Sequence, residues 1–112
     1  MRGSAAVLAV AAGILGTACQ PADGGPAELG RRTYMGRCIQ CHNPNPQLDG
    51  TLGPAIAGSS RELVEARVLR AEYPAGYTPK RTTQAMPAQP DLASQIEGLA
   101  AYLGSIAADP AR

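Results

Sequence analysis

Two cysteines and the only histidine of this 112-residue chain stand within one five-residue stretch, as Cys38, Cys41 and His42. Residues of these types bind metals and carry redox chemistry, so the cluster restricts what the chain can fold around. A structural zinc site takes four ligands, usually from two such pairs, and Cys19 is the sole cysteine left to help complete one. A thioredoxin-type redox pair belongs in a βαβ unit, and a simple disulfide leaves His42 without a role. None of these sites accounts for all three residues.

The Cys-x-x-Cys-His spacing is also the signature of covalent haem attachment. Two thiols about one helical turn apart can each form a thioether bond with a haem vinyl group, and the histidine that follows is held against the iron. We therefore predict one haem c, attached through Cys38 and Cys41, with His42 as an axial ligand of the iron.

The second axial ligand must come from another residue type, because His42 is the only histidine. Of the three methionines, Met1 is removed if the N-terminal leader is cleaved, and Met35 lies one turn before Cys38, too close to reach the other face of a haem. Met86 remains, and a thioether is a soft ligand that raises the reduction potential of a haem. We predict Met86 as the second ligand; the alternative is a methionine that fills a gap in the core.

The first 18 residues have the layout of a secretory signal peptide. Arg2 precedes an apolar run from Ala5 to Leu15, and small residues lead to Cys19. This run is shorter than a membrane-spanning helix requires. The alternative, an N-terminal helix of the domain that is apolar on every side, needs a larger core than this chain can build. We expect an exported, periplasmic protein.

Two processing sites fit this leader. "LGTAC" resembles the lipobox of bacterial lipoproteins, in which the cysteine, here Cys19, becomes the lipidated N-terminus. Gly16 and Ala18 also fit an ordinary signal peptidase site, and Cys19 is then a spare thiol. We favour lipidation, with residues 19–26, rich in Gly and Pro, as a flexible linker to a membrane.

The composition argues against nucleic-acid binding. Ten basic and nine acidic residues become nine and nine once the leader with Arg2 is removed, and there is no Trp or Phe for base stacking. A domain of under about a hundred residues whose only aromatics are four tyrosines buries little apolar surface. A bound group could therefore supply part of the core.

The pattern along the chain predicts an all-α domain. Helices are expected over residues 26–38, 59–73 and 91–105, and the loops between them, rich in Pro and Gly, show no strand-like alternation. Loops this long in so small a domain are typical of segments that wrap around something.

Local patterns predict the helix ends and buried faces. Ser59 and Glu62 have capping-box spacing, and Asp91 suits the N-cap of the last helix. Leu29 and Tyr34 are expected to share a face of the first helix, and Gly104 to stop the last one. The expected core face of the last helix carries Leu92, Ile96, Leu99 and Leu103.

The chain resembles the small single-haem class I c-type cytochromes over Ala27–Ile106. The matching segments are "CIQCH", "LGPAIAG" and "AMPAQPDLASQIEGLAAYL". The resemblance implies the cytochrome c fold, with three or more helices and long loops wrapped around one covalently bound haem. It implies a domain at residues 27–106, followed by a tail at 107–112.

The resemblance also implies roles for single residues. The Pro54 carbonyl is expected to accept a hydrogen bond from His42 Nδ1. Gly30 and Tyr34 are expected to meet Leu99 and Tyr102 where the first and last helices cross. By analogy, the haem propionates would be paired by residues of the second long loop, namely Tyr73, Tyr77, Lys80 and Arg81. The alternative for Lys80 and Arg81 is a solvated loop tip.

These observations predict a single-electron carrier rather than an enzyme. An apolar pocket would limit water and favour the ferrous state; its expected members are Leu48, Leu52, Ile56, Leu63, Val68 and Leu99. Expected partners are redox proteins such as an oxidase, reductase or dehydrogenase, bound through a small interface to which Arg31, Arg32 and Arg37 could contribute. The alternatives are a haem-based gas or redox sensor and an open-site haem enzyme such as a peroxidase.

Overall fold

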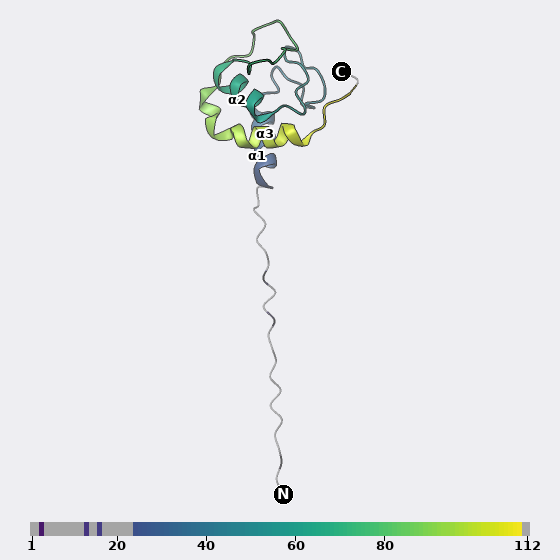
Figure 1. Cartoon of the computed structure of the whole chain (residues 1–112). Helices are drawn as coiled ribbons and strands as arrows, with labels where there is room; N and C mark the ends of the chain where they lie inside the picture. The colour runs from purple at the N-terminus through teal and green to yellow at the C-terminus, as the bar shows by residue number, and fades with distance from the viewer. Residues whose placement is uncertain (1–2, 4–12, 14–15, 17–23, 111–112) are drawn as a thin grey trace.

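The computed structural model describes residues 3, 13, 16 and 24–110 (Figure 1). Three α-helices make up its frame: α1 (Gly25–Arg37), α2 (Arg61–Arg70) and α3 (Ile96–Ser105), with a short 3-10 helix, η1 (Pro90–Gln95), directly before α3. The part of the chain that the structure describes contains no strand, so the all-α prediction is confirmed. Cys19 and most of the expected leader and linker lie outside the described residues.

The described helices are all short. None of them is both long enough and apolar enough to cross a membrane. Long loops join α1 to α2 and α2 to η1, and Figure 1 shows them gathered on the side of the domain away from the crossing of α1 and α3.

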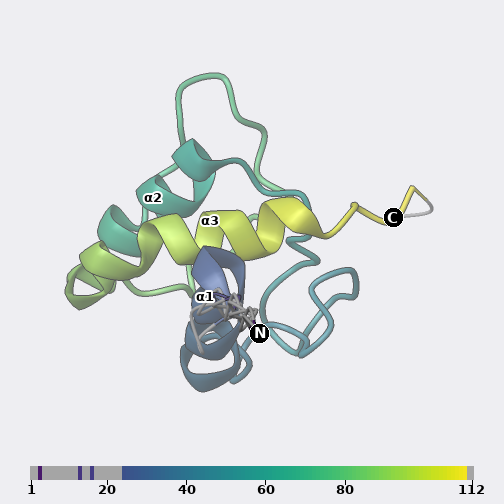
Figure 2. The same ribbon diagram turned by 90° about the horizontal axis from the view of Figure 1, so that it is seen from below.

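Helices α1 and α3 cross in contact, as Figure 2 shows with α1 seen nearly end-on beneath α3. Gly30 and Gly98 make this approach possible, because a Cβ atom on Gly30 would overlap the carbonyl of Gly98. The aromatic rings of Tyr34 and Tyr102 pack beside the crossing, with centroids 5.6 Å apart. The residues at the crossing are therefore those that the resemblance implied.

The core lies between the helices around two fully buried side chains, Tyr34 and Leu99. Tyr34 also satisfies its hydroxyl, which donates a hydrogen bond to the carbonyl of Asn43 (2.6 Å). The expected core face of the last helix is confirmed, since all four of its apolar residues are buried with Val64 and Val68 of α2. The prediction for Leu29 was wrong: its side chain is 44% exposed, because it lies five positions from Tyr34 and faces solvent.

Helix α2 begins one residue later than its expected capping box. The hydroxyl of Ser60, not Ser59, accepts the hydrogen bond from the backbone N–H of Leu63. Ser59 instead donates its hydroxyl proton to the carbonyl of Ile56. Two adjacent serines can both cap a helix, and the preceding turn occupies the first of them.

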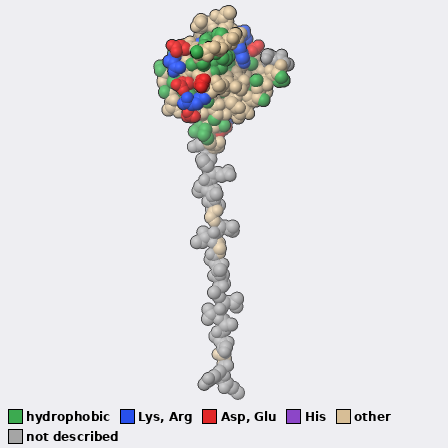
Figure 3. Space-filling view, viewed as in Figure 1, with side chains coloured by type: hydrophobic (Ala, Val, Ile, Leu, Met, Phe, Trp, Pro, Cys, Tyr) green, Lys and Arg blue, Asp and Glu red, His purple; other side chains and the backbone are tan. Residues whose placement is uncertain are grey.

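Ion pairs tie α2 to α3 on the surface. Arg61 of α2 donates to Glu97 of α3 and to Glu65 of its own helix, each at 2.6 Å. Arg70 lies within ion-pair distance of Glu65 and Glu72. On the face of the domain that Figure 3 shows, acidic and basic side chains adjoin one another rather than gathering separately. Exposed pairs of this kind each stabilise a fold weakly.

Asp91 does not cap the last helix. It lies within η1, and its carboxylate accepts a hydrogen bond from Arg37 at the end of α1 (3.0 Å). Helix α3 starts at Ile96 and continues through Gly104 to Ser105, so the predicted stop at Gly104 was one residue early. Arg37 and Asp91 are separated by 54 positions in the chain. The spacing of neighbouring residues therefore could not predict their contact.

Candidate functional site

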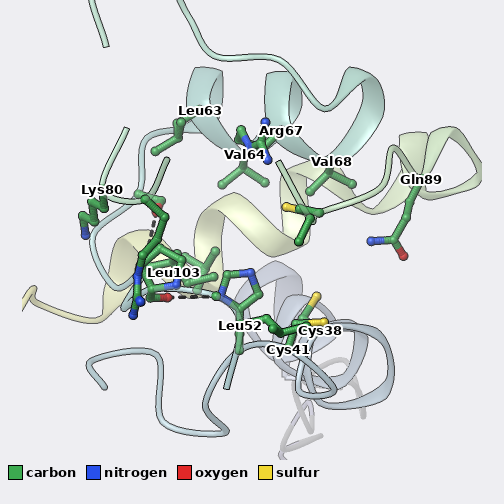
Figure 4. Close-up of a pocket in the computed structure, with 18 of the residues that line it drawn as sticks. Cys38, Cys41, Leu52, Leu63, Val64, Arg67, Val68, Lys80, Gln89 and Leu103 are labelled. Carbon is green, nitrogen blue, oxygen red and sulfur yellow. Dashed lines mark hydrogen bonds between the residues drawn. The ribbon is translucent and has the colours of Figure 1, made fainter. Parts of the chain in front are cut away.

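A cavity of about 310 Å³ lies among α1, α2, α3 and the two long loops. This volume is within the range of sites that hold small molecules and cofactors. In Figure 4, Cys38, Cys41 and Leu52 lie on one side, and Leu63, Val64 and Val68 of α2 lie across the cavity from them. The remaining apolar wall residues include Ile56, Leu99 and Leu103.

The two cysteines lie where α1 ends. The backbone N–H of Cys38 donates to Tyr34, and that of His42 donates to Cys38 (both 2.9 Å), so the chain keeps a helical turn through the cluster. Both thiols are free and half-buried, and both line the cavity. Burial raises the pKa of the Cys38 thiol to about 11, which keeps it protonated at neutral pH.

The imidazole of His42 is held by the first long loop. Its Nδ1 lies 3.1 Å from the carbonyl oxygen of Pro54. A carbonyl only accepts, so Nδ1 carries the proton and Nε2 keeps a free lone pair. Gly53 packs against the ring so closely that a Cβ atom there would overlap it. Burial lowers the pKa of His42, and the hydrogen bond to Pro54 opposes that shift.

The loop behind His42 is built from local hydrogen bonds. The Oδ1 atoms of Asn43 and Asn45 each accept from the backbone N–H two residues later (2.9 and 3.0 Å), which makes two successive turns with Pro44 and Pro46 inside them. The carbonyl of Pro46 then accepts from the two backbone N–H groups at 56 and 57. The repeated Asn-Pro sequence therefore turns the chain away from α1.

The same loop closes back on the cysteine turn. The carbonyl of Cys41 accepts hydrogen bonds from the backbone N–H groups of Leu52 and Gly53. Gly50 also lies against it, since a Cβ atom there would overlap the Cys41 carbonyl. These contacts fix the position of Pro54 relative to His42.

Met86 reaches the cavity from the second long loop. Its half-buried side chain packs against the hydrophobic core and lines the same cavity as His42. The segment is held at its far end by Gln89, whose backbone N–H donates to the carbonyl of Val68 (2.6 Å) and whose side chain accepts from Arg37. No hydrogen bond formed among the described residues involves residues 82–88.

The other residues of this loop singled out in the sequence also line the cavity. Lys80 donates to the carbonyl of Ala55 (2.7 Å), and Arg81 lies 3.6 Å from the carboxylate of Asp49. Both side chains are exposed at the cavity mouth. The rings of Tyr73 and Tyr77 stack 5.5 Å apart, and burial raises the pKa of Tyr77.

Three wall residues differ from the sequence-based expectation. Leu48 is not part of the cavity wall, and Leu52, although it lines the cavity, is 58% exposed. Arg67 was missed as a site residue: it is half-buried in α2 and lines the cavity. Its position one turn after Val64 on the core side was the available sequence indication.

The wall chemistry fits a haem. Two thiols and an imidazole with a free Nε2 lie on one side, a thioether reaches the cavity from another segment, and the rest is largely apolar. Within the described residues, no three His, Cys, Asp or Glu side chains gather as they would around a bare metal ion. A comparison with protein families matches residues 27–107 to the model described as cytochrome c.

The chain belongs to the cytochrome c family. It is a small class I c-type cytochrome that binds haem c covalently, and its helical fold agrees with that family. No curated protein matches the chain. Cytochromes of this class typically carry electrons and are typically exported.

Proposed function

We propose that this cytochrome carries single electrons with its haem iron bound by His42 and Met86. The observation that supports this proposal best is that both side chains line one cavity, while Pro54 engages Nδ1 of His42 and leaves Nε2 for a metal. A ligand histidine whose second nitrogen is hydrogen-bonded has a fixed ring orientation and higher basicity.

Each group of residues has a role in this proposal. The haem supplies a one-electron couple when bound. Cys38 and Cys41 would hold it by thioether bonds, and Met86 would bind its iron with a soft thioether that favours the ferrous state. The apolar wall from α2 and α3 excludes water, which disfavours the more highly charged ferric state.

The mouth of the cavity suits the acidic edge of the haem. Lys80, Arg81 and Tyr77 line the cavity near the Pro54 loop. We assign Tyr77 and Arg81 to the propionates, with Pro54 holding the imidazole from behind. Arg81 would then share its charge between a propionate and Asp49.

The proposed location is the periplasm, with Cys19 lipidated and the residues between Cys19 and the start of α1 at Gly25 as the tether. Partners would be redox proteins such as an oxidase, a reductase or a dehydrogenase, bound briefly through a small interface. Mass spectrometry of the mature N-terminus tests the anchor: we expect a lipid on Cys19, and an unmodified N-terminus would exclude it.

A carbon monoxide titration of the reduced protein tests the closed iron site. We expect no rapid binding at neutral pH, because Met86 would already bind the iron. Rapid stoichiometric binding of carbon monoxide would exclude an electron carrier with both iron ligands in place. It would favour a gas sensor or an open-site enzyme. The reduced holoprotein before and after mild denaturation serves as the reference, since unfolding detaches the methionine and exposes the iron.

A further inference from the structure

Arg67 is a charged side chain in the wall of the haem cavity. It comes from α2 between the buried residues Ala66 and Val68, and Figure 4 shows it beside Val64. It is half-buried, and among the described residues no carboxylate forms an ion pair with it. None of the residues that line the cavity is acidic.

Two contacts hold the guanidinium in place. Its Nη1 donates to the carbonyl of Ala71 (2.7 Å), and its central carbon lies 4.2 Å from the centroid of the Tyr73 ring. Tyr73 stacks in turn on Tyr77, with the rings 8° from parallel. Cation–π contact and a carbonyl acceptor leave the positive charge in place without neutralising it.

The backbone at the end of α2 brings these groups together. Ala71 has a left-handed conformation (φ 54°), and the N–H groups of Ala71 and Glu72 donate to Arg67 and Ala66 in a Schellman arrangement. This turn sends the chain back over the helix end, so that the Tyr73 ring covers the guanidinium.

The other cations of the cavity differ from Arg67. Arg37, Lys80 and Arg81 are exposed at the rim, and two of them are paired, Arg37 with Asp91 and Arg81 with Asp49. Solvent and carboxylates screen such charges strongly. A half-buried charge without a counter-ion acts over a longer distance in the lower dielectric of the protein.

We propose that Arg67 is a fixed cation that raises the reduction potential of the haem. On reduction the ferric iron gains one electron from the donor, no bond forms or breaks, and the charge of the centre falls by one. A nearby uncompensated cation repels the ferric form more than the ferrous form. The inference rests on the proposed electron-carrier function.

Potentiometric titration of holoprotein variants tests the proposal. R67Q removes the charge and keeps a donor for Ala71, and we expect the equilibrium constant for reduction to fall about tenfold, about 59 mV for a one-electron couple. R67K keeps the charge and is expected to stay within threefold of the wild type. R70Q is the matched control, because Arg70 is exposed and paired with Glu72, and its change is expected to stay within threefold.

The result is read only from variants whose absorption spectra match the wild type, so that the ligand set is unchanged. Where R67Q does not accumulate, R67M gives the same comparison with an uncharged side chain of similar length. An unchanged potential in the neutral variant, or an equal fall in R67K, overturns the role of Arg67. Rapid carbon monoxide binding by the wild type would instead overturn the proposed function, so the two failures are distinguishable.

Discussion

Gly30 of α1 and Gly98 of α3 meet backbone to backbone at the crossing of the two helices. The space between them holds no side-chain carbon: a Cβ on Gly30 would overlap the Gly98 carbonyl, and a Cβ on Gly98 would lie 3.0 Å from Gly30 N and Pro26 O. Because α1 leads directly into the cysteine turn, this contact sets where the haem attachment residues lie relative to α3.

The substitution G30A tests this contact. We expect it to destabilise the protein by about 3 kcal/mol, since the added methyl group must push the helices apart. G36A is the matched control on the same helix: nothing lies within 4 Å of a Cβ there, and alanine should stabilise the helix by about 1 kcal/mol. Denaturant midpoints of the two variants measure the effect, and equal midpoints would contradict the contact.

The left-handed residue Ala71 predicts a stabilising substitution. Alanine is strained at a φ of 54°, whereas glycine adopts this conformation readily, so A71G should raise stability by about 0.5–1 kcal/mol. A101G, inside α3, should lower it by about 1 kcal/mol. Thermal melts of both variants give the comparison, and destabilisation by A71G would show that the turn does not strain the chain.

Met86 and Met35 allow a matched test of the iron ligand. M86A should lower the reduction potential by at least about 59 mV, a tenfold change for one electron, and open the iron to carbon monoxide. M35A, a change on the exposed side of α1, should alter neither property. An M86A protein with the wild-type spectrum and potential would exclude Met86 as the ligand.

The pair formed by Arg37 and Asp91 predicts a pH dependence of stability. The hydrogen bond from Arg37 lowers the pKa of Asp91, so the folded state favours the ionised carboxylate. The stability that this pair adds is fully present above the pKa of about 3.9 that an aspartate has in the unfolded chain. It is lost as the pH falls through the lower pKa that Asp91 has in the folded state. D91N should therefore flatten the fall in stability as the pH drops below about 4.

Both groups of this pair are exposed, so the effect should also weaken in high salt. The measurement is the denaturation midpoint of wild type and D91N against pH, at low and high ionic strength. Parallel curves for the two proteins would show that the ion pair does not contribute.

The sequence predicted the helical class and the buried face of the last helix, because apolar spacing and helical geometry depend on neighbouring residues. It also predicted the family, through the cysteine turn and the methionine loop. It misplaced the start of the last helix, where Asp91 is engaged by Arg37 from another helix. It missed Arg67 as a site residue, since the position of the Tyr73 ring depends on the turn at Ala71.

The two successive Asn-Pro turns have a consequence for how the cavity assembles. Their hydrogen bonds, and those that the backbone N–H groups of Leu52 and Gly53 donate to the Cys41 carbonyl, join residues two to twelve positions apart. Contacts so close in the chain form early in folding. The segment that carries Met86 is fixed by contacts with residues about 20 to 50 positions away. We therefore expect the histidine side to be ordered first, with the methionine joining last and detaching first.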